Sequence, residues 1–255
     1  MTQTIIETIP ILPFGMVNAF LVIHERRALL VDTGLPGSEG KIENALKMHK
    51  LDWSDIALTV LTHAHIDHAG SAAQVRRLTA QPLFAHKDEF PYCNGYPPVL
   101  RPSGIFGRVF QKTGAIEQGF EYFTPDLPLT KAEADLSPFG FPASALHTPG
   151  HTPGSLSVLL DDGRVIAGDL LASGILLGGI AMRSRPKKPP FEEDTVAVAD
   201  SLDQLLSRGG KYFYLGHGGR LPASTVRAHV SRLRSADRPG VFKLPRILPN
   251  DQTWM

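Results

Sequence analysis

One short stretch constrains this chain more than any other, because it places four potential metal ligands between a predicted strand and a predicted helix. It runs from Thr62 to Gly70 with the letters THAHIDHAG, directly after a short apolar run. His63 and His65 are two residues apart, so in extended backbone both imidazoles point to the same side and can reach one metal ion. Asp67 and His68 lie where the chain turns into the helix, and from there they can face a second ion.

Four further His or Asp side chains come at the ends of other predicted strands, each beside a glycine or a turn. Open sheets bind their ligands in the crevice outside the carboxyl ends of the strands, so we expect these side chains to gather near residues 63–68. Each one alone has an ordinary explanation as a turn residue or a helix cap, so the prediction depends on their joint occurrence. The four are Asp32 after the run 28–31, His151 after 143–146, Asp169 after 164–167 and His217 after 212–215.

The composition argues against several other kinds of protein. Lys and Arg number 26 and Asp and Glu 25, and the resulting net charge of +1 gives no support to a nucleic-acid or anionic membrane partner. The single cysteine, Cys93, excludes an internal disulfide and a multi-cysteine metal site, so histidine must carry any metal chemistry. No apolar run approaches the roughly 18 residues of a membrane span, and residues 1–11 lack the pattern of a secretory signal. We therefore expect a cytoplasmic protein that acts on a small molecule.

Strand and helix patterns alternate along the chain and repeat the same theme in two halves. The 255 residues fit one domain over 1–255. Short apolar, β-branched runs predict strands, and apolar residues at helical spacing predict helices. The expected strands are 19–23, 28–31, 56–61, 82–85, 143–146, 155–160, 164–167 and 212–215, and the expected helices are 41–49, 69–78, 194–206 and 224–233.

Three segments do not fit this alternation. Residues 90–126 are rich in aromatics, prolines and glycines and predict an irregular loop, which is either a lid that walls the site or an interface, for example in a homodimer. Residues 173–191 carry several basic side chains and predict a solvated loop. Residues 238–255 hold three prolines and little periodicity, and predict a tail on the surface.

Together these residues resemble the metallo-β-lactamase superfamily, whose five motifs are matched in order over residues 18–219. The resemblance implies an α/β fold, a four-layer αββα sandwich made of two similar halves. It also implies a ligand set for two divalent ions per chain, with zinc best suited to imidazole and carboxylate ligands and iron or manganese as alternatives. The implied ligands are His63, His65 and His151 for the first ion, Asp67, His68 and His217 for the second, and Asp169 for both, with Asp32 hydrogen-bonded within the cluster.

The resemblance implies a metal-dependent hydrolase. Two cations that share one water make a metal-bridging hydroxide available near neutral pH, and this hydroxide attacks an electrophilic carbonyl. Asp67 is the expected catalytic residue, because its free oxygen can orient the nucleophile or carry its proton. The expected substrate is a small-molecule ester, lactone or thioester.

Within the family, the bridging Asp169 favours the glyoxalase II or lactonase type over true β-lactamases, whose pattern lacks this bridge. Two details weaken the individual subtypes. Lactonases typically carry a tyrosine shortly after the bridging aspartate, whereas residues 170–173 hold none, unless a tyrosine from 90–126 takes its place. Glyoxalase II relatives hold glutathione with a basic C-terminal helical region, whereas Lys243 and Arg246 lie in a proline-containing tail.

Other functions of the same fold stay open. One is an iron-dependent sulfur dioxygenase, whose mononuclear site would leave His217 or Asp67 without a metal. Others are a β-lactam hydrolase, a phosphodiester hydrolase and a relative that binds a ligand without catalysis. The complete ligand set favours an enzyme. From the sequence we therefore adopt the hypothesis of a metal-dependent hydrolase.

Overall fold

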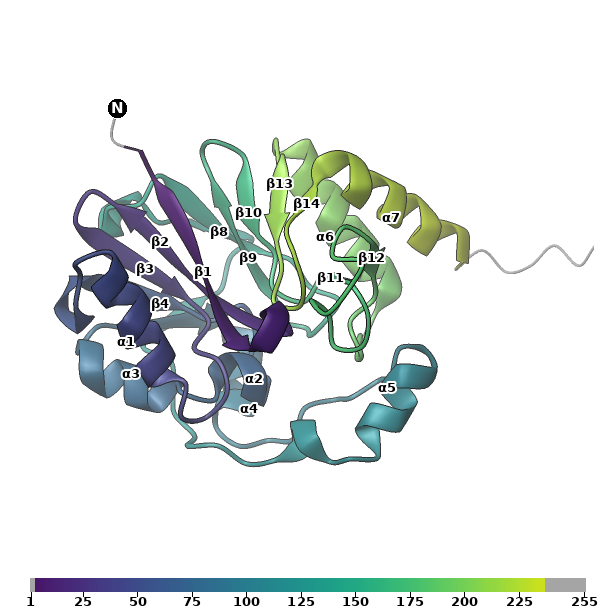
Figure 1. Ribbon diagram of the computed structural model, residues 1–255, viewed down its shortest axis with the longest axis horizontal. Coiled ribbons are helices and arrows are strands. Elements are labelled where there is room, and N and C mark those ends of the chain that lie inside the picture. Colours follow the sequence, from purple (N-terminus) through teal and green to yellow (C-terminus); the bar gives the residue numbers. More distant parts are fainter. Residues whose placement is uncertain (1–2, 237–255) are drawn as a thin grey trace, which may run out of the picture.

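The computed structural model describes residues 3–236 and holds two six-stranded sheets that pack face to face (Figure 1). The strands of the first sheet, in the order in which they pair, are β1 (Ile5–Leu12), β2 (Val17–His24), β3 (Arg27–Val31), β4 (Ile56–Val60), β5 (Leu83–His86) and β6 (Leu127–Leu129). Those of the second are β14 (Leu221–Pro222), β13 (Tyr212–Tyr214), β10 (Arg164–Ile166), β9 (Leu156–Leu160), β8 (Ala143–His147) and β7 (Glu133–Asp135).

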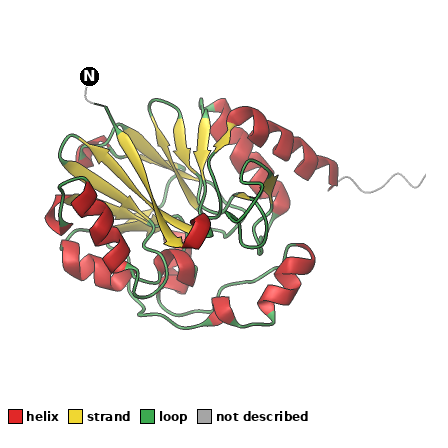
Figure 2. Cartoon of the chain, in the orientation of Figure 1, coloured by secondary structure: helices red, strands yellow, loops and turns green. Residues whose placement is uncertain are grey.

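Helices cover the outer face of each sheet (Figures 1 and 2). α1 (Glu39–Met48) and α3 (Ala72–Thr79) pack on the first sheet, and α6 (Thr195–Ser207) and α7 (Ala223–Ala236) pack on the second. The four layers are therefore helix, sheet, sheet and helix, which confirms the αββα sandwich that the resemblance implies. The remaining elements are α2 (Ile66–Ala69), α4 (Phe90–Cys93), α5 (Gly104–Gln111) and the two-stranded ribbon of β11 (Ala172–Ser173) and β12 (Pro186–Lys187).

The central strands are buried on both faces, which explains why they form continuous apolar runs in the sequence. In β2, Phe20 and Val22 point into the core between the two sheets. Their neighbours Leu21 and Ile23 point the other way, into the core that α1 closes. This alternation follows from the period of two residues in a strand. The core between the two sheets and the core under α1 both depend on this alternation.

The predicted strands and helices are confirmed, with ends that differ by a few residues, but the edges of the sheets differ from the prediction. β1 is missing from the predicted strands because Glu7 and Thr8 interrupt its apolar pattern. Its antiparallel pairing with β2 carries a register shift near Pro10, where a proline on an edge strand is tolerated. The short strands β6, β7 and β14 are also unpredicted, since two or three residues carry no periodicity.

The prediction of an irregular loop over residues 90–126 is wrong in part, because this segment contains α4, α5 and a 3-10 turn at Ala115–Glu117. Two long connections carry α5 away from the sheets (Figure 1). The solvated loop predicted over 173–191 likewise includes the β11–β12 ribbon. The predicted tail, residues 238–255, lies outside the described residues. Within residues 3–236, no helix combines the length and the apolar character that a membrane crossing requires.

Two phenylalanines test this description of the core. Phe141 is fully buried between the sheets, whereas Phe14 is 68% exposed. Truncation of Phe141 to Ala should lower the free energy of unfolding by about 3–5 kcal/mol, because it leaves a cavity. The same change at Phe14 should alter it by less than about 0.5 kcal/mol. Urea denaturation followed by circular dichroism measures both, and equal losses at the two positions would contradict the assignment.

Candidate metal centre

The ends of five strands, β3, β4, β8, β10 and β13, lead into the loops that hold the expected site residues. All eight residues named from the sequence lie within one buried cluster, which both sheets contribute to. The first sheet supplies Asp32 and the stretch from His63 to His68. The second sheet supplies His151, Asp169 and His217. The structure thus brings together the side chains that we expected, from their positions after strand ends, to lie close to one another.

Three imidazole nitrogens form a near-equilateral triangle at one side of the cluster. His63 Nε2, His65 Nδ1 and His151 Nε2 lie 3.1 Å from one another. Tetrahedral zinc ligands about 2.0–2.1 Å from the ion are separated by roughly 3.3 Å. The triangle therefore has close to the dimensions that three ligands of one zinc ion would have.

Asp67, His68 and His217 form a second group beside the first. The Oδ2 atom of Asp67 lies 3.4 Å from His217 Nε2 and 3.9 Å from His68 Nε2. Asp169 lies between the groups, since its Oδ2 atom is 2.9 Å from His217 Nε2 and 3.8 Å from His151 Nε2. Its Oδ1 atom is 3.4 Å from His68 Nε2. Asp169 is thus the one carboxylate that faces both groups.

Four of the five histidines are held through the ring nitrogen that points away from the cluster. Such partners fix the orientation and tautomer of an imidazole that binds a metal. Only His65 lacks one, since its Nε2 atom is buried without a hydrogen-bond partner. The four pairs are His63 Nδ1 with Thr62 Oγ1, His68 Nδ1 with Asp32 Oδ2, His151 Nδ1 with the Phe191 carbonyl and His217 Nδ1 with the Met16 carbonyl.

The electrostatics of the two groups differ. Burial lowers the pKa of His65 to about 4 and that of His151 to about 3, and it lowers the pKa of His63 well below its usual value. These three rings are neutral at pH 7, as metal ligands must be. Burial alone would also lower the pKa of His68, but Asp169, Asp32 and Asp67 outweigh it and raise the value to about 10. The second group therefore attracts positive charge.

Several buried polar atoms in the cluster have no hydrogen-bond partner. They are His65 Nε2, Asp67 Oδ1, His68 Nε2 and Asp169 Oδ1. Buried polar atoms are normally paired, because an unpaired one costs free energy. His68 Nε2 and Asp169 Oδ1 lie 3.4 Å apart, and a divalent cation beside them would satisfy both once the imidazole loses its proton. The residues present therefore fit the two ions that the ligand set implies.

Gly216 permits the close packing of this cluster. A Cβ atom at this position would lie 2.2 Å from Asp169 Oδ1 and 2.6 Å from His68 Cε1. Any larger residue would push one of these two side chains out of place. The glycine that precedes His217 in the sequence is thus required by sterics rather than by a turn.

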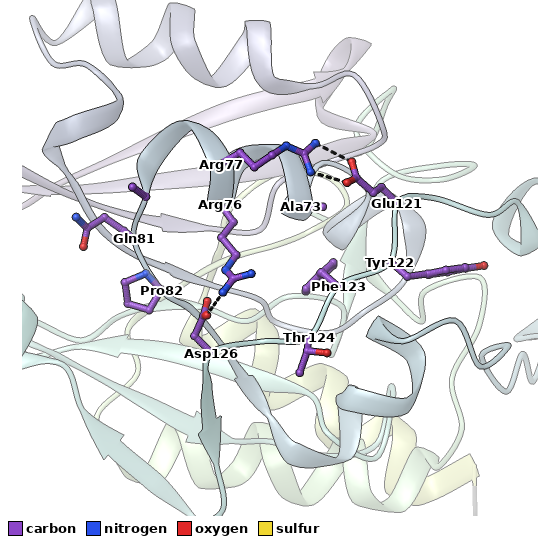
Figure 3. A pocket seen from close by; sticks show the side chains of 11 residues that line it. Ala73, Arg76, Arg77, Gln81, Pro82, Glu121, Tyr122, Phe123, Thr124 and Asp126 are labelled. Atoms are coloured by element: carbon purple, nitrogen blue, oxygen red, sulfur yellow. Dashed lines mark hydrogen bonds and ion pairs between the residues drawn. The ribbon is translucent and has the colours of Figure 1, made fainter.

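One cavity of the described chain lies beside helix α3 (Figure 3). Its volume is about 700 Å³, and it lies between α3 and the segment 121–126. Its charged groups are already paired, Arg76 with Asp126 and Arg77 with Glu121. None of the eight cluster residues lines it.

A second cavity, of about 490 Å³, borders the metal-ligand stretch directly. Ala64 and Ile66, the two neighbours of His65, form part of its wall. The rest comes from the segment 92–122, whose three tyrosines, Tyr92, Tyr96 and Tyr122, all line it. Part of the aromatic segment therefore lines a cavity next to the ligand stretch, and within residues 3–236 no hydrogen bond joins one of these tyrosines to the cluster.

The aromatic segment is also tied to the ligand loops of the second half. The Ser103 N–H donates to the Pro190 carbonyl, and the Phe110 ring packs 5.9 Å from that of Phe191. The carbonyl of Phe191 is the group that holds His151. The position of α5 and the orientation of a candidate ligand are thus coupled through one residue.

Sequence reasoning misses several residues of the site. Thr62 and Gly216 lie inside the motifs but receive no role, because their contacts cross between distant strands. Glu89 is missed altogether, since it ends a run of three charged residues that looks exposed. It is in fact fully buried and bonded to Ala64 and Thr152. Only the buried strand directly before this run hints at its burial.

Comparisons with known proteins agree with this geometry. A family model described as "Metallo-beta-lactamase superfamily" matches residues 12–217. YflN of Bacillus subtilis, a probable metallo-hydrolase, is 28% identical over 214 residues, which cover 80% of this chain and 80% of that protein. Hydroxyacylglutathione hydrolase GloC of Haemophilus influenzae is 27% identical over 173 residues, covering 66% of this chain and 73% of that protein. The crystal structure of BLEG-1 B3 metallo-beta-lactamase matches in fold, with a TM-score of 0.65 at 22% identity and 90% and 99% of the two chains covered.

The hydrogen bonds of Asp32 lead to a prediction. This carboxylate accepts from the backbone and hydroxyl of Thr62 and holds His68. In Asp32→Asn, the amide cannot accept from all three donors, while asparagine tolerates the positive φ of 63° at this position. We expect binding of one of two zinc ions to weaken about 10–100-fold. Zinc competition with a chelator measures this, with the exposed Asp161→Asn as the control. Two ions bound as tightly as in the unaltered protein would contradict the role of Asp32.

Proposed function

Because the chain belongs to the metallo-β-lactamase superfamily, we propose that this metal-dependent hydrolase holds two divalent ions and cleaves a small-molecule ester, lactone or thioester. The observation that carries the proposal is the cluster itself. Five imidazoles and two carboxylates from both sheets converge in one cluster, and four of their buried atoms have no hydrogen-bond partner. A structural polar cluster would pair such atoms, whereas a binding site for cations leaves them free.

The ligand assignment follows the two groups. His63, His65 and His151 would hold the first ion. Asp67, His68 and His217 would hold the second, and Asp169 would contact both. When bound, such ions supply an activated water near neutral pH and polarise the oxygen of a carbonyl. Zinc suits this mixture of ligands best, with iron or manganese as alternatives.

Asp67 is the residue that we assign to proton transfer. Its side chain is 12% exposed, whereas the side chains of Asp169 and His217 are 3% and 4% exposed. Asp67 therefore borders the side of the cluster that a substrate can approach. Its Oδ1 atom has no hydrogen-bond partner and is free to accept the proton of an attacking water.

The cavity beside His65 supports a substrate with an apolar or aromatic acyl group. Its wall combines tyrosines, prolines and Phe120 with a few polar side chains such as Gln111. Apolar walls with few polar anchors are typical of small-molecule sites. The name of the relative GloC, a hydroxyacylglutathione hydrolase, supports a thioester of glutathione as one candidate. A lactone with an acyl substituent is the other.

The first test measures metal content and substrate class together. Protein loaded with zinc should hold close to two ions per chain, measured by elemental analysis. A panel of lactones, thioesters, aryl esters, phosphodiesters and β-lactams should show turnover of a carboxylic ester, lactone or thioester, abolished by chelation and restored by metal. Turnover confined to β-lactams or phosphodiesters would overturn the proposal. One iron ion per chain with oxygen consumption would instead identify a sulfur dioxygenase.

The second test changes Asp67. Asp67→Asn keeps the size of the side chain but removes its ability to take a proton, so kcat should fall about 10²–10⁴-fold. Circular dichroism should show an unchanged fold. Asp161→Asn, on an exposed turn, serves as the control. Near-normal turnover of every substrate by the metal-loaded Asp67→Asn protein would exclude this role.

A further inference from the structure

Glu89 is a fully buried carboxylate that takes no part in the cluster described above. It follows β5 at the end of a 3-10 turn, Lys87–Glu89. Within residues 3–236 no Lys, Arg or His forms an ion pair with it, and its partners are three uncharged donors instead. Oε2 accepts from the Ala64 N–H at 2.8 Å, and Oε1 accepts from the Thr152 hydroxyl at 2.6 Å and the Gly154 N–H at 3.0 Å.

The donors of Glu89 lie next in sequence to the three histidines of the first group or close to them. Ala64 lies between His63 and His65, and Thr152 directly follows His151. One carboxylate therefore holds residues adjacent to each of these three histidines. Oε2 accepts from the loop that holds His63 and His65, and Oε1 accepts from the loop that holds His151.

The two loops need such a connection. His151 is 88 residues from His63 in the sequence, and the nitrogens of the two rings are 3.1 Å apart. The Nδ1 atoms of His63 and His151 donate to Thr62 Oγ1 and the Phe191 carbonyl, so their two Nε2 atoms face each other as lone pairs and repel when no cation lies beside them. Contacts outside the rings must therefore hold the loops in place before an ion binds. Glu89 supplies three such contacts at normal hydrogen-bond lengths.

The surroundings of Glu89 are shaped for this arrangement. A Cβ atom at Gly154 would lie 2.7 Å from Glu89 Oε1, so only glycine leaves room for the carboxylate. Burial raises the pKa of Glu89 to about 7, although the hydrogen bonds from Thr152, Ala64 and Gly154 oppose this. A buried carboxylate without a cation is costly. Glutamine or an apolar residue would fill the same space at lower cost, so packing alone does not explain the choice of residue.

We propose that Glu89 is a positioning residue that ties the two histidine loops together and so sets the spacing of His63, His65 and His151 for the first metal ion. The proposal rests on the ligand assignment made above. It adds a carboxylate that touches neither metal nor substrate and acts through two backbone N–H groups and the Thr152 hydroxyl of the ligand loops.

Glu89→Gln tests the proposal with the least change in shape. A glutamine keeps one acceptor oxygen, so its amide NH₂ group must face a donor of one loop and release that loop. We expect the zinc dissociation constant of the first site to rise about 10–100-fold, as is usual when a partner of a ligand is lost. Competition with a chromophoric chelator measures this. In metal-free protein, hydrogen exchange should also accelerate at the amides of Ala64 and Gly154.

Cys93→Ala is the matched control. Cys93 is buried in the same apolar cluster as Ala64, and its thiol makes no hydrogen bond with either loop. Its truncation should lower stability and leave zinc affinity unchanged. If Glu89 served only the stability of the fold, Glu89→Gln would behave like this control and show a lower melting temperature with unchanged zinc affinity. That result would overturn the proposal.

Two further outcomes separate this proposal from the proposed function. If the unaltered protein does not bind zinc in the competition assay, the ligand assignment itself fails. If it binds zinc and folded Glu89→Gln binds equally well, only the positioning role fails. Should Glu89→Gln not fold, Thr152→Val decides, because it removes one donor of the His151 loop and keeps the shape of the side chain. Weaker zinc binding by Thr152→Val supports the role of Glu89, and unchanged binding rejects it.

Discussion

The burial of carboxylates and imidazoles at the shared end of the two sheets is the constraint on which the rest of the structure depends. Asp32, Asp169 and the five histidines of the cluster are almost inaccessible to solvent. Charged groups in such a place need partners, and part of that need is met inside the protein. Asp32 accepts three hydrogen bonds, and Asp169 lies against His217 and His68. His68 Nε2 and Asp169 Oδ1 stay without hydrogen bonds at 3.4 Å from each other, which makes the space beside them a candidate site for a cation.

Contacts between distant parts of the backbone hold this arrangement. The Met16 carbonyl orients His217, and the Asn18 side chain donates to the carbonyls of Leu215 and Gly218. The first sheet thereby fixes a ligand loop of the second. Glu89 makes the corresponding connection between the loops of His65 and His151. The bonds of Asn18 and two of the three bonds of Glu89 go to backbone groups of the loops, so they set the position of a whole loop rather than that of a single side chain.

The aromatic segment lines a cavity beside the candidate metal centre and also contacts one of its ligand loops. Its tyrosines wall the cavity next to Ile66, while Phe110 packs against Phe191, whose carbonyl holds His151. The sandwich therefore holds the candidate ligands, and the segment 92–122 forms most of the wall of the adjacent cavity. This division is common in folds that serve many reactions, because loops change without disturbing the core. It explains why the ligand set indicates the class of reaction much better than it indicates the substrate.

The sequence by itself determined the strand pattern of the sheet centres and the residues of the candidate metal centre. Both depend on local features, namely the two-residue period of buried strands and the place of His63, Asp169 and their partners directly after them. The layers followed from the family resemblance that these residues carry. Only the tertiary structure decided the edge strands, the cavity wall and the role of Glu89. Those depend on contacts between residues far apart in the chain, and no local period or spacing records them. Glu89 shows the reason most plainly. The third charged residue in a row is normally exposed to solvent. Glu89 is buried at the place where hydrogen-bond donors from two distant loops meet its carboxylate.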